Sequence, residues 1–200
     1  MKLYYVPKTR ASRPRWVLEE VGVPYDLVRL EPGPGGTRSP EHVARHPLGH
    51  VPVLEDRGQS VFESGAICLH LADLFPEKRL LPAPGTVDRA HAYQWVLFSV
   101  AEMELPLMAL SAEAKKPDAE RNARVSADAR ERFGKTASTL EAVLRDRRYL
   151  VGDAVGVADV MVGATLAWAR AMRLVDALPS LEGYLSRLRE RPAWQRAVAD

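Results

Sequence analysis

The chain has 200 residues, of which 46% are hydrophobic and 27% charged, so we expect folded domains with a sizeable core rather than disorder. Basic residues number 28 and acidic residues 26, and this balance argues against nucleic acid or an anionic membrane as the main partner. The single cysteine, Cys68, excludes an intrachain disulfide, and the five histidines show no metal-ligand spacing. With no apolar core of a signal peptide and no apolar run of about 20 residues, we expect a cytoplasmic protein without a metal site or membrane span.

The first part of the chain alternates strands and helices. β-branched and aromatic residues predict a strand over Lys2–Val6, which Pro7 ends, and a second strand over Tyr25–Leu30. A helix is predicted between them over Ser12–Val21, with Ser12 as its N-cap and Gly22 as its stop. Because a helical crossover joins these two strands, they should be parallel.

A Gly/Pro-rich loop over 31–39 and a short helix over Glu41–Arg45 come next. Two short strands, Val51–Leu54 and Ser60–Glu63, flank a tight turn and must be antiparallel, and an apolar helix over Ser64–Phe75 follows. The pattern therefore predicts an α/β domain with a mixed four-stranded sheet and helices on its faces.

The strand signals stop at a proline-punctuated linker, and only helical periodicity follows. Pro106 should kink the first of these helices, and the segment Val157–Met172 is nearly all apolar, so it should be buried on all sides. The sequence predicts an N-terminal domain over 1–77, a linker over 78–86 and an all-α domain over 87–200. The expected helices are Thr86–Ala112, Asp118–Arg147, Val157–Met172, Pro179–Arg189 and Pro192–Val198.

The segments VPVLED, ESGAI and VGDAVGVADV, at their spacings, make the chain resemble the cytosolic glutathione transferase family, with a bacterial, beta- or theta-like pattern. The resemblance covers essentially the whole chain. It implies a thioredoxin-like N-terminal domain, a C-terminal helical bundle and a homodimer. It also implies glutathione as cosubstrate, whose thiol is activated as a thiolate for conjugation to a hydrophobic electrophile.

The same resemblance assigns a glutathione-binding role to Val51, Pro52, Glu63 and Ser64, and to His50 before them. Pro52 would be cis, Val51 would pair with the peptide backbone of glutathione, and Glu63 with Ser64 would hold its γ-glutamyl end. Other interpretations stay open from the residues alone. Ser64 would then be only an N-cap, Glu63 a first-turn acid and His50 a solvated side chain.

A free thiol has a pKa of about 8.5, so the reaction needs a hydrogen-bond donor or a cation that stabilises the thiolate. By the resemblance, that group follows the first strand. Thr9 occupies the position of a catalytic serine and ranks first, before Ser12 and Tyr5. Ser12 can instead serve only as a cap and Tyr5 only as a strand residue. Arg10 replaces the active cysteine of the beta class and can act as a cationic stabiliser.

The electrophile should bind between the loop after the first strand and the kinked helix. The candidate walls of its pocket are Trp95, Phe98 and Met103, together with Tyr93 and Met108, although the same spacing also suits a helix core. Asp159, three residues after Gly156, matches the capping position of the family's folding motif, and we assign it a structural role.

Two other functions remain compatible with these residues. A glutathione-dependent isomerase or peroxidase would use the same thiolate. A non-catalytic glutathione-binding or partner-binding protein would keep the binding residues but lack an effective hydroxyl. A thioredoxin-like redox protein is disfavoured because the chain contains no CxxC pair.

Overall fold

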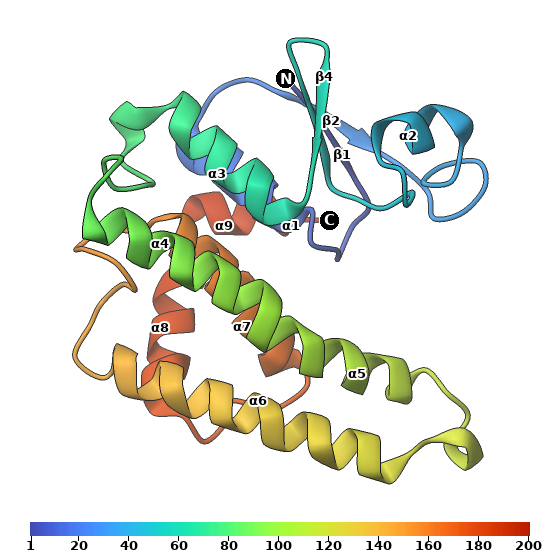
Figure 1. Cartoon of the computed structure of the whole chain (residues 1–200), viewed down its shortest axis with the longest axis vertical. Coiled ribbons are helices and arrows are strands. Elements are labelled where there is room, and N and C mark those ends of the chain that lie inside the picture. Colours follow the sequence, from blue (N-terminus) through green and yellow to red (C-terminus); the bar gives the residue numbers. More distant parts are fainter. The chain divides into compact units, whose positions relative to one another are not determined.

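The computed structural model describes residues 1–200, and the chain divides into two compact units. The first unit comprises Met1–Leu81 together with Arg189–Asp200, and the second comprises Pro82–Leu188. Each unit is described by itself. In Figure 1 the first unit contains the blue and cyan strands and helices, and the red end of the chain belongs with it.

The first unit is built on a mixed four-stranded sheet of order β2-β1-β3-β4. The central strand β1 (Lys2–Tyr5) runs parallel to β2 (Asp26–Arg29) and antiparallel to β3 (Val53–Asp56), which pairs with β4 (Gln59–Phe62) in a hairpin. The register places Leu3 opposite both Leu27 and Leu54. The sequence prediction of one parallel pair and one hairpin is confirmed, as is the thioredoxin-like class of the unit.

Three helices accompany the sheet: α1 (Ser12–Val21), α2 (Pro40–Arg45) and α3 (Ser64–Leu74), and a 3₁₀ turn η1 (Pro76–Lys78) follows. α1 buries Trp16, Val17 and Val21, which lie on one helical face, and packs against α3. It ends as predicted at Gly22, whose φ of 76° is the left-handed conformation that glycine adopts without a steric penalty.

The predicted N-cap role of Ser12 is wrong. The cap position of α1 belongs to Ala11, which has helical dihedrals and no capping side chain, and Ser12 is already the first helical residue. The reason is that the chain turns before the helix begins. The N–H groups of Ser12 and Arg13 donate to the carbonyls of Thr9 and Arg10, so backbone acceptors replace the side-chain cap.

The last helix, α9 (Pro192–Ala197), packs on α1 and therefore belongs to the first unit. The Trp194 ring meets the Trp16 ring edge-on at 4.7 Å between centroids, and the Arg191 guanidinium donates to both oxygens of Glu20 at 2.6 and 2.8 Å. Figure 1 shows the two helices side by side. The sequence-based division placed the C-terminal residues in the helical domain. The structure instead joins α9 to the first unit, because its residues contact residues of α1 that are far away in the sequence.

The C-terminal residue completes this contact. The Asp200 carboxylate accepts hydrogen bonds from the Tyr5 hydroxyl and from the Arg15 guanidinium. The Tyr5 hydroxyl, followed by Arg15, holds the pKa of the Asp200 carboxyl below its usual range, and the same hydrogen bond raises the pKa of Tyr5. The hydroxyl of Tyr5 is therefore engaged at the C-terminal end of the chain.

We expect Asp200→Asn to lower the free energy of unfolding at pH 7 by about 1 kcal/mol or less, because the carboxylate is partly exposed to solvent. A carboxyl with a depressed folded-state pKa contributes stability above its unfolded pKa of about 3.9 and loses it as the pH falls through the folded value. In urea unfolding at pH 7, 5 and 3, the difference in unfolding free energy between Asp200→Asn and wild type should become smaller only below about pH 4. An equal loss in Asp176→Asn, at an exposed acid of the second unit, would contradict this origin.

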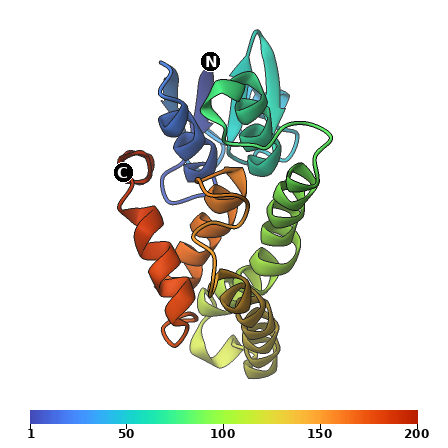
Figure 2. The same ribbon diagram turned by 90° about the vertical axis from the view of Figure 1, so that its left-hand side faces the viewer.

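The second unit is entirely helical, and Figure 2 shows its helices from green to orange gathered in a bundle. α5 packs along α6, and α4 packs against α7, most of whose residues are buried. The predicted all-α bundle is confirmed. Its elements are α4 (Val87–Phe98), the π turn η2 (Ser99–Met103), α5 (Glu104–Ala114), the 3₁₀ turn η3 (Asp118–Glu120), α6 (Ala123–Leu144), α7 (Val157–Ala171) and α8 (Pro179–Arg189).

The irregularity predicted at Pro106 lies one turn earlier, in η2. Proline has no N–H for the carbonyl of residue 102, and its ring would collide with that carbonyl in a regular helix. Widening the backbone over Ser99–Met103 accommodates both effects. The buried Ser99 hydroxyl donates to the Met161 carbonyl at 3.1 Å and shares a hydrogen bond with Thr165, which fixes this turn on α7.

Asp159 forms the polar centre of the bundle. It is fully buried, and its carboxylate accepts from the N–H groups of Leu150 and Gly156 at 2.9 Å each and from the Tyr184 hydroxyl at 2.7 Å. Burial raises the pKa of the carboxyl, and the three donated hydrogen bonds act in the opposite direction. The carboxylate therefore joins the start of α7 to the preceding loop and to α8.

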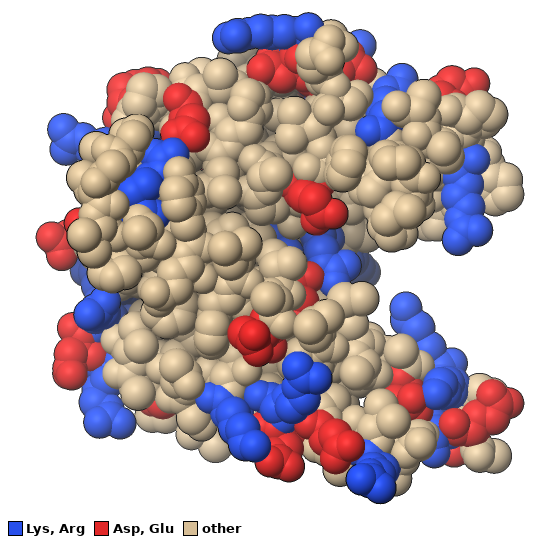
Figure 3. Space-filling view, in the orientation of Figure 1, with Lys and Arg blue, Asp and Glu red and all other residues tan.

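The surface and the apolar helices bear on possible partners. Lys and Arg side chains are interspersed with Asp and Glu over the face displayed in Figure 3, as expected from the near balance of charges. One helical stretch, Val87–Ala114, is long and apolar enough to cross a membrane. It is interrupted by η2 and packs on α6 and α7, while other large apolar residues of the stretch, among them Leu97, Leu105 and Met108, are exposed.

Candidate functional site

The first element of the site is the bend that precedes β3. The Val51-Pro52 peptide bond is cis, which confirms the sequence-based expectation. Pro52 is buried and Val51 is half-buried. Neither the N–H nor the C=O of Val51 forms a hydrogen bond within the protein, so both are available to a ligand.

The second element is the start of α3. Glu63 occupies the cap position with a φ of 71°, a conformation that is uncommon for residues other than glycine. No side chain caps this helix, so the interpretation of Ser64 as its N-cap is wrong. The first-turn N–H groups, from Ser64 to Ala66, are left without intrahelical partners, and such a helix start attracts anions. A strained backbone conformation at an exposed acidic residue such as Glu63 is typical of a functional position.

A buried arginine lies beneath this helix start. The Arg13 guanidinium, 3% exposed, donates to the Ser64 hydroxyl oxygen at 3.2 Å. Because α1 and α3 pack together, Arg13 brings a positive charge from the first turn of α1 to the first turn of α3. Sequence reasoning did not identify Arg13. Its spacing of three and four residues from the apolar Trp16 and Val17 is the signal that places it on the buried face of α1.

Three histidines line the other side of the bend. His42 is fully buried and its Nε2 forms a 2.8 Å hydrogen bond with the carbonyl oxygen of His50, which fixes the peptide just before Val51. The buried His46 ring lies 5.4 Å from the exposed His50 ring and 4.7 Å from the Phe62 ring. Burial, followed by the neighbouring His50, lowers the pKa of His46. Of these residues, only His50 was predicted from the sequence.

The loop between β1 and α1 contains the predicted thiolate-stabilising groups, and the structure gives them different surroundings. The Thr9 hydroxyl donates to the Val6 carbonyl at 2.6 Å and accepts from the Ala11 N–H, so it stabilises the loop itself. The Tyr5 hydroxyl donates to Asp200. Ser12 is half-buried, and its hydroxyl makes no hydrogen bond within the protein. Arg10 is half-buried in the same turn.

The predicted walls of the electrophile pocket lie on α4, η2 and α5. Trp95 and Met103 are buried in the second unit, and the Trp95 ring contacts the Phe98 ring edge-on at 5.2 Å. Phe98 is half-buried, whereas Tyr93 and Met108 are 40% and 48% exposed. Trp95 and Met103 thus serve the core, and the electrophile pocket stays a prediction.

The geometry of the first unit combines a cis-proline bend that leaves a free peptide group with an uncapped helix start backed by a buried arginine. Residues 1–73 match the family model described as "Glutathione S-transferase, N-terminal domain", and residues 109–195 match "Glutathione S-transferase, C-terminal domain". The chain belongs to the glutathione S-transferase family. The narrower beta- or theta-like pattern stays a prediction, since the similar proteins include both plant and bacterial members.

Curated relatives resemble this glutathione S-transferase family member over nearly its whole length. Glutathione S-transferase 4 of Zea mays is 35% identical over 189 residues, which cover 91% of this chain and 84% of the relative. Glutathione S-transferase GstA of Escherichia coli is 27% identical and covers 100% and 98% of the two chains. Among solved structures, a sphingomonad glutathione S-transferase complexed with glutathione superposes with a TM-score of 0.88 at 27% identity, covering 100% and 98%.

Proposed function

We propose that the protein is a glutathione transferase, which binds glutathione in its first unit and activates the thiol for conjugation to a hydrophobic electrophile. The observation that carries the proposal is the uncapped start of α3 beside the free peptide group of Val51, in a member of this family. We further propose that the protein acts in the cytoplasm as a homodimer, and that glutathione is a cosubstrate rather than a bound prosthetic group.

Recognition of glutathione is divided between two backbone features. The N–H and C=O of Val51 would pair with the peptide part of glutathione as an added strand does. The γ-glutamyl carboxylate would accept hydrogen bonds from the N–H groups at the start of α3 and from the Ser64 hydroxyl, and Glu63 would pair with the ammonium group. His50, exposed beside the bend, would face the glycyl end.

Arg13 supports this carboxylate site from beneath. When its guanidinium donates to the Ser64 oxygen, the hydroxyl hydrogen of Ser64 is left free to donate to the ligand. The positive charge also favours an anion at the helix start, because it is buried and so weakly screened by solvent. Arg13 is therefore a positioning residue for Ser64.

Ser12 is the best-placed donor to the thiolate. A hydroxyl has one hydrogen, and that of Thr9 is already used on Val6 and that of Tyr5 on Asp200. Ser12 keeps its hydrogen and lies in the first turn of α1, next to Arg13, which contacts the start of α3. The helix start adds a positive potential that further stabilises a thiolate.

A second function is favoured by the same observations. If neither Thr9 nor Ser12 reaches the sulfur, the protein would bind glutathione without activating it and would serve as a binding protein. The observation that supports this alternative is that two of the three predicted hydroxyl donors, Thr9 and Tyr5, already donate to other groups of the protein. Isomerase or peroxidase activity with the same thiolate would differ from conjugation only in the electrophile.

The proposal is tested by steady-state turnover of glutathione with an activated aryl halide. We expect saturable conjugation by the wild type and, in Ser64→Ala, a KM for glutathione raised about tenfold with a smaller change in kcat, because a charge-assisted hydrogen bond to the substrate is lost. Ser60→Ala, at an exposed position of β4, is the matched control and should leave both constants unchanged. Retention on immobilised glutathione without turnover would contradict the transferase proposal and favour the non-catalytic glutathione-binding protein.

A further inference from the structure

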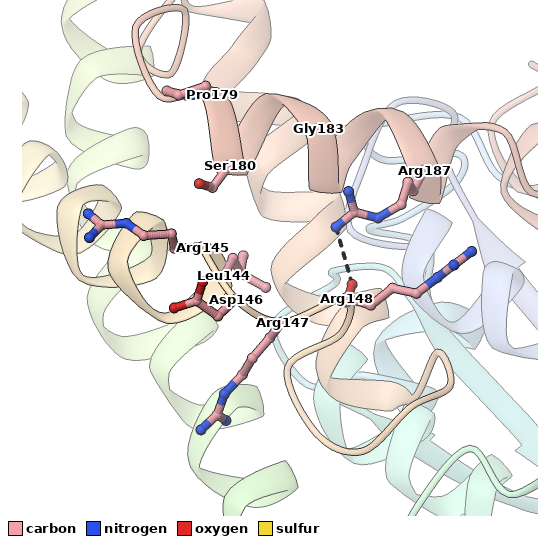
Figure 4. A pocket seen from close by; sticks show the side chains of 9 residues that line it. All are labelled: Leu144, Arg145, Asp146, Arg147, Arg148, Pro179, Ser180, Gly183 and Arg187. Carbon is pink, nitrogen blue, oxygen red and sulfur yellow. Dashed lines mark hydrogen bonds between the residues drawn. The ribbon is translucent and has the colours of Figure 1, made fainter.

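The second unit contains an open hollow of about 460 Å³ between the loop that follows α6 and one side of α8, from Pro179 to Arg187. Figure 4 shows the side chains that line it. Four of them are arginines, namely Arg145, Arg147 and Arg148 from the loop and Arg187 from α8, and one is an acid, Asp146. Four positive charges against one negative charge give the lining a net charge of +3. None of these residues belongs to the proposed glutathione site.

The hollow is poor in counter-charges. None of its four arginines forms a close ion pair, and neither does Asp146; Arg145 alone interacts electrostatically with a nearby carboxylate, that of Glu141. Elsewhere in the same unit, Arg121, Arg124 and Arg170 each pair with a carboxylate at 2.6, 3.9 and 3.2 Å. Like charges that line one hollow repel each other, so the lining is better neutralised by an anion from solution than by the protein itself.

Arg187 has an unused donor at this position. Its Nη2 donates to the carbonyl oxygen of Arg148 at 3.3 Å, which ties α8 to the loop. Its Nε is buried and has no hydrogen-bond partner. Because Nε is shielded from solvent and Nη2 is used on Arg148, an anion in the open hollow would meet the outer, Nη side of this guanidinium.

The start of α8 does not by itself account for an anion site. The Glu141 carboxylate already accepts from the N–H groups of Ser180 and Leu181 at 3.0 and 2.9 Å. What remains for a ligand is the guanidinium side chains, because the Ser180 hydroxyl, like the two N–H groups, hydrogen-bonds to the Glu141 carboxylate. Any anion bound here would therefore be recognised by arginine rather than by a helix terminus.

We propose that this hollow binds a small multivalent oxyanion of the phosphate-ester or pyrophosphate class, with Arg148 and Arg187 as its central contacts. The volume lies within the range of about 300–1,000 Å³ that is usual for small-molecule sites. In Figure 4 the loop arginines extend in different directions; their side chains are exposed, and that of Arg148 lies over the Tyr149 ring, 5.8 Å from its centroid. A phosphate group can gather them because each new guanidinium contact is a charge-assisted hydrogen bond.

The experiment is a calorimetric titration of the full-length protein with inorganic pyrophosphate at low ionic strength. We expect saturable one-to-one binding in the wild type. The Kd should rise at least about tenfold in Arg187→Gln and in the double variant Arg147→Gln/Arg148→Gln, because each loses a charge-assisted contact. The double variant removes exposed side chains, so it tests the site even if Arg187→Gln disturbs the packing of α8.

The matched control is Arg130→Gln/Arg132→Gln, which removes two exposed charges from α6 in the same unit. Its Kd for pyrophosphate should stay within about twofold of wild type, since a change of net charge alone is a screened, long-range effect. Heats that do not saturate, or an equal loss of binding in the control and in the hollow variants, would overturn the proposal. Glutathione turnover should be the same in all of these variants.

Discussion

Asp159→Ala is expected to lower the free energy of unfolding by about 3 kcal/mol or more, because three donors lose their acceptor and each buried unsatisfied donor costs about 1–3 kcal/mol. The donors are the N–H groups of Leu150 and Gly156 and the hydroxyl of Tyr184, and they come from the loop before α7, the start of α7 and α8. The loss therefore affects three segments of the bundle at once. Urea unfolding followed by circular dichroism measures it.

Tyr184→Phe is the matched control, because it removes one donor and leaves the other two satisfied. Its cost should not exceed about 1.5 kcal/mol, the usual contribution of one hydrogen bond. Neither substitution should change the affinity for glutathione, since Asp159 lies in the helical unit and has a structural role. An Asp159→Ala protein that unfolds like wild type but no longer binds glutathione would contradict this assignment.

Local patterns predicted most of the fold. α1 and α8 have the bounds expected from periodicity and from their stop and start residues, and the four strands differ from expectation by a few residues at their ends. These elements depend on residues close together in the sequence, such as Gly22 after α1. Family motifs likewise located the cis-proline bend and the start of α3.

Contacts between distant residues could not be predicted in the same way. The attachment of α9 to the first unit depends on Arg191 meeting Glu20, 171 positions earlier. His42 has its role through the carbonyl of His50, and Arg13 through Ser64, and neither spacing is visible in a single helix. The order of the candidate donors also needed the structure, because a sequence does not show which hydroxyl already has an acceptor.

Ser12→Ala should therefore be the most damaging substitution for catalysis. Removal of one preorganised hydrogen-bond donor costs about 10²–10³-fold in rate, and we expect kcat/KM for glutathione at pH 7 to fall by about 10²-fold. The free energy of unfolding should change little, because the hydroxyl makes no hydrogen bond within the protein. KM should change less than kcat, since the carboxylate and backbone contacts of glutathione are retained.

The pH dependence distinguishes this role from a structural one. Without the donor, the pKa of the bound thiol should rise toward its free value of about 8.5, so less thiolate is present at pH 7. The activity of Ser12→Ala should consequently increase with pH over a range in which the activity of the wild type is already constant. The ratio of wild-type to variant activity should therefore be smaller at pH 9 than at pH 7. Stopped-flow or steady-state rates from pH 6 to 9 provide the measurement.

Thr9→Ala is the matched control, because Thr9 carries a hydroxyl in the same loop, three positions before Ser12. Its hydroxyl donates to the Val6 carbonyl, so the substitution should cost about 1 kcal/mol of stability and leave the pH profile unshifted. If Thr9→Ala shifts the profile and Ser12→Ala does not, the Thr9 hydroxyl must exchange Val6 for the sulfur when glutathione binds, and the assignment of Ser12 fails. If neither variant shifts it, the thiolate is stabilised by the start of α1 and by Arg10 rather than by a hydroxyl.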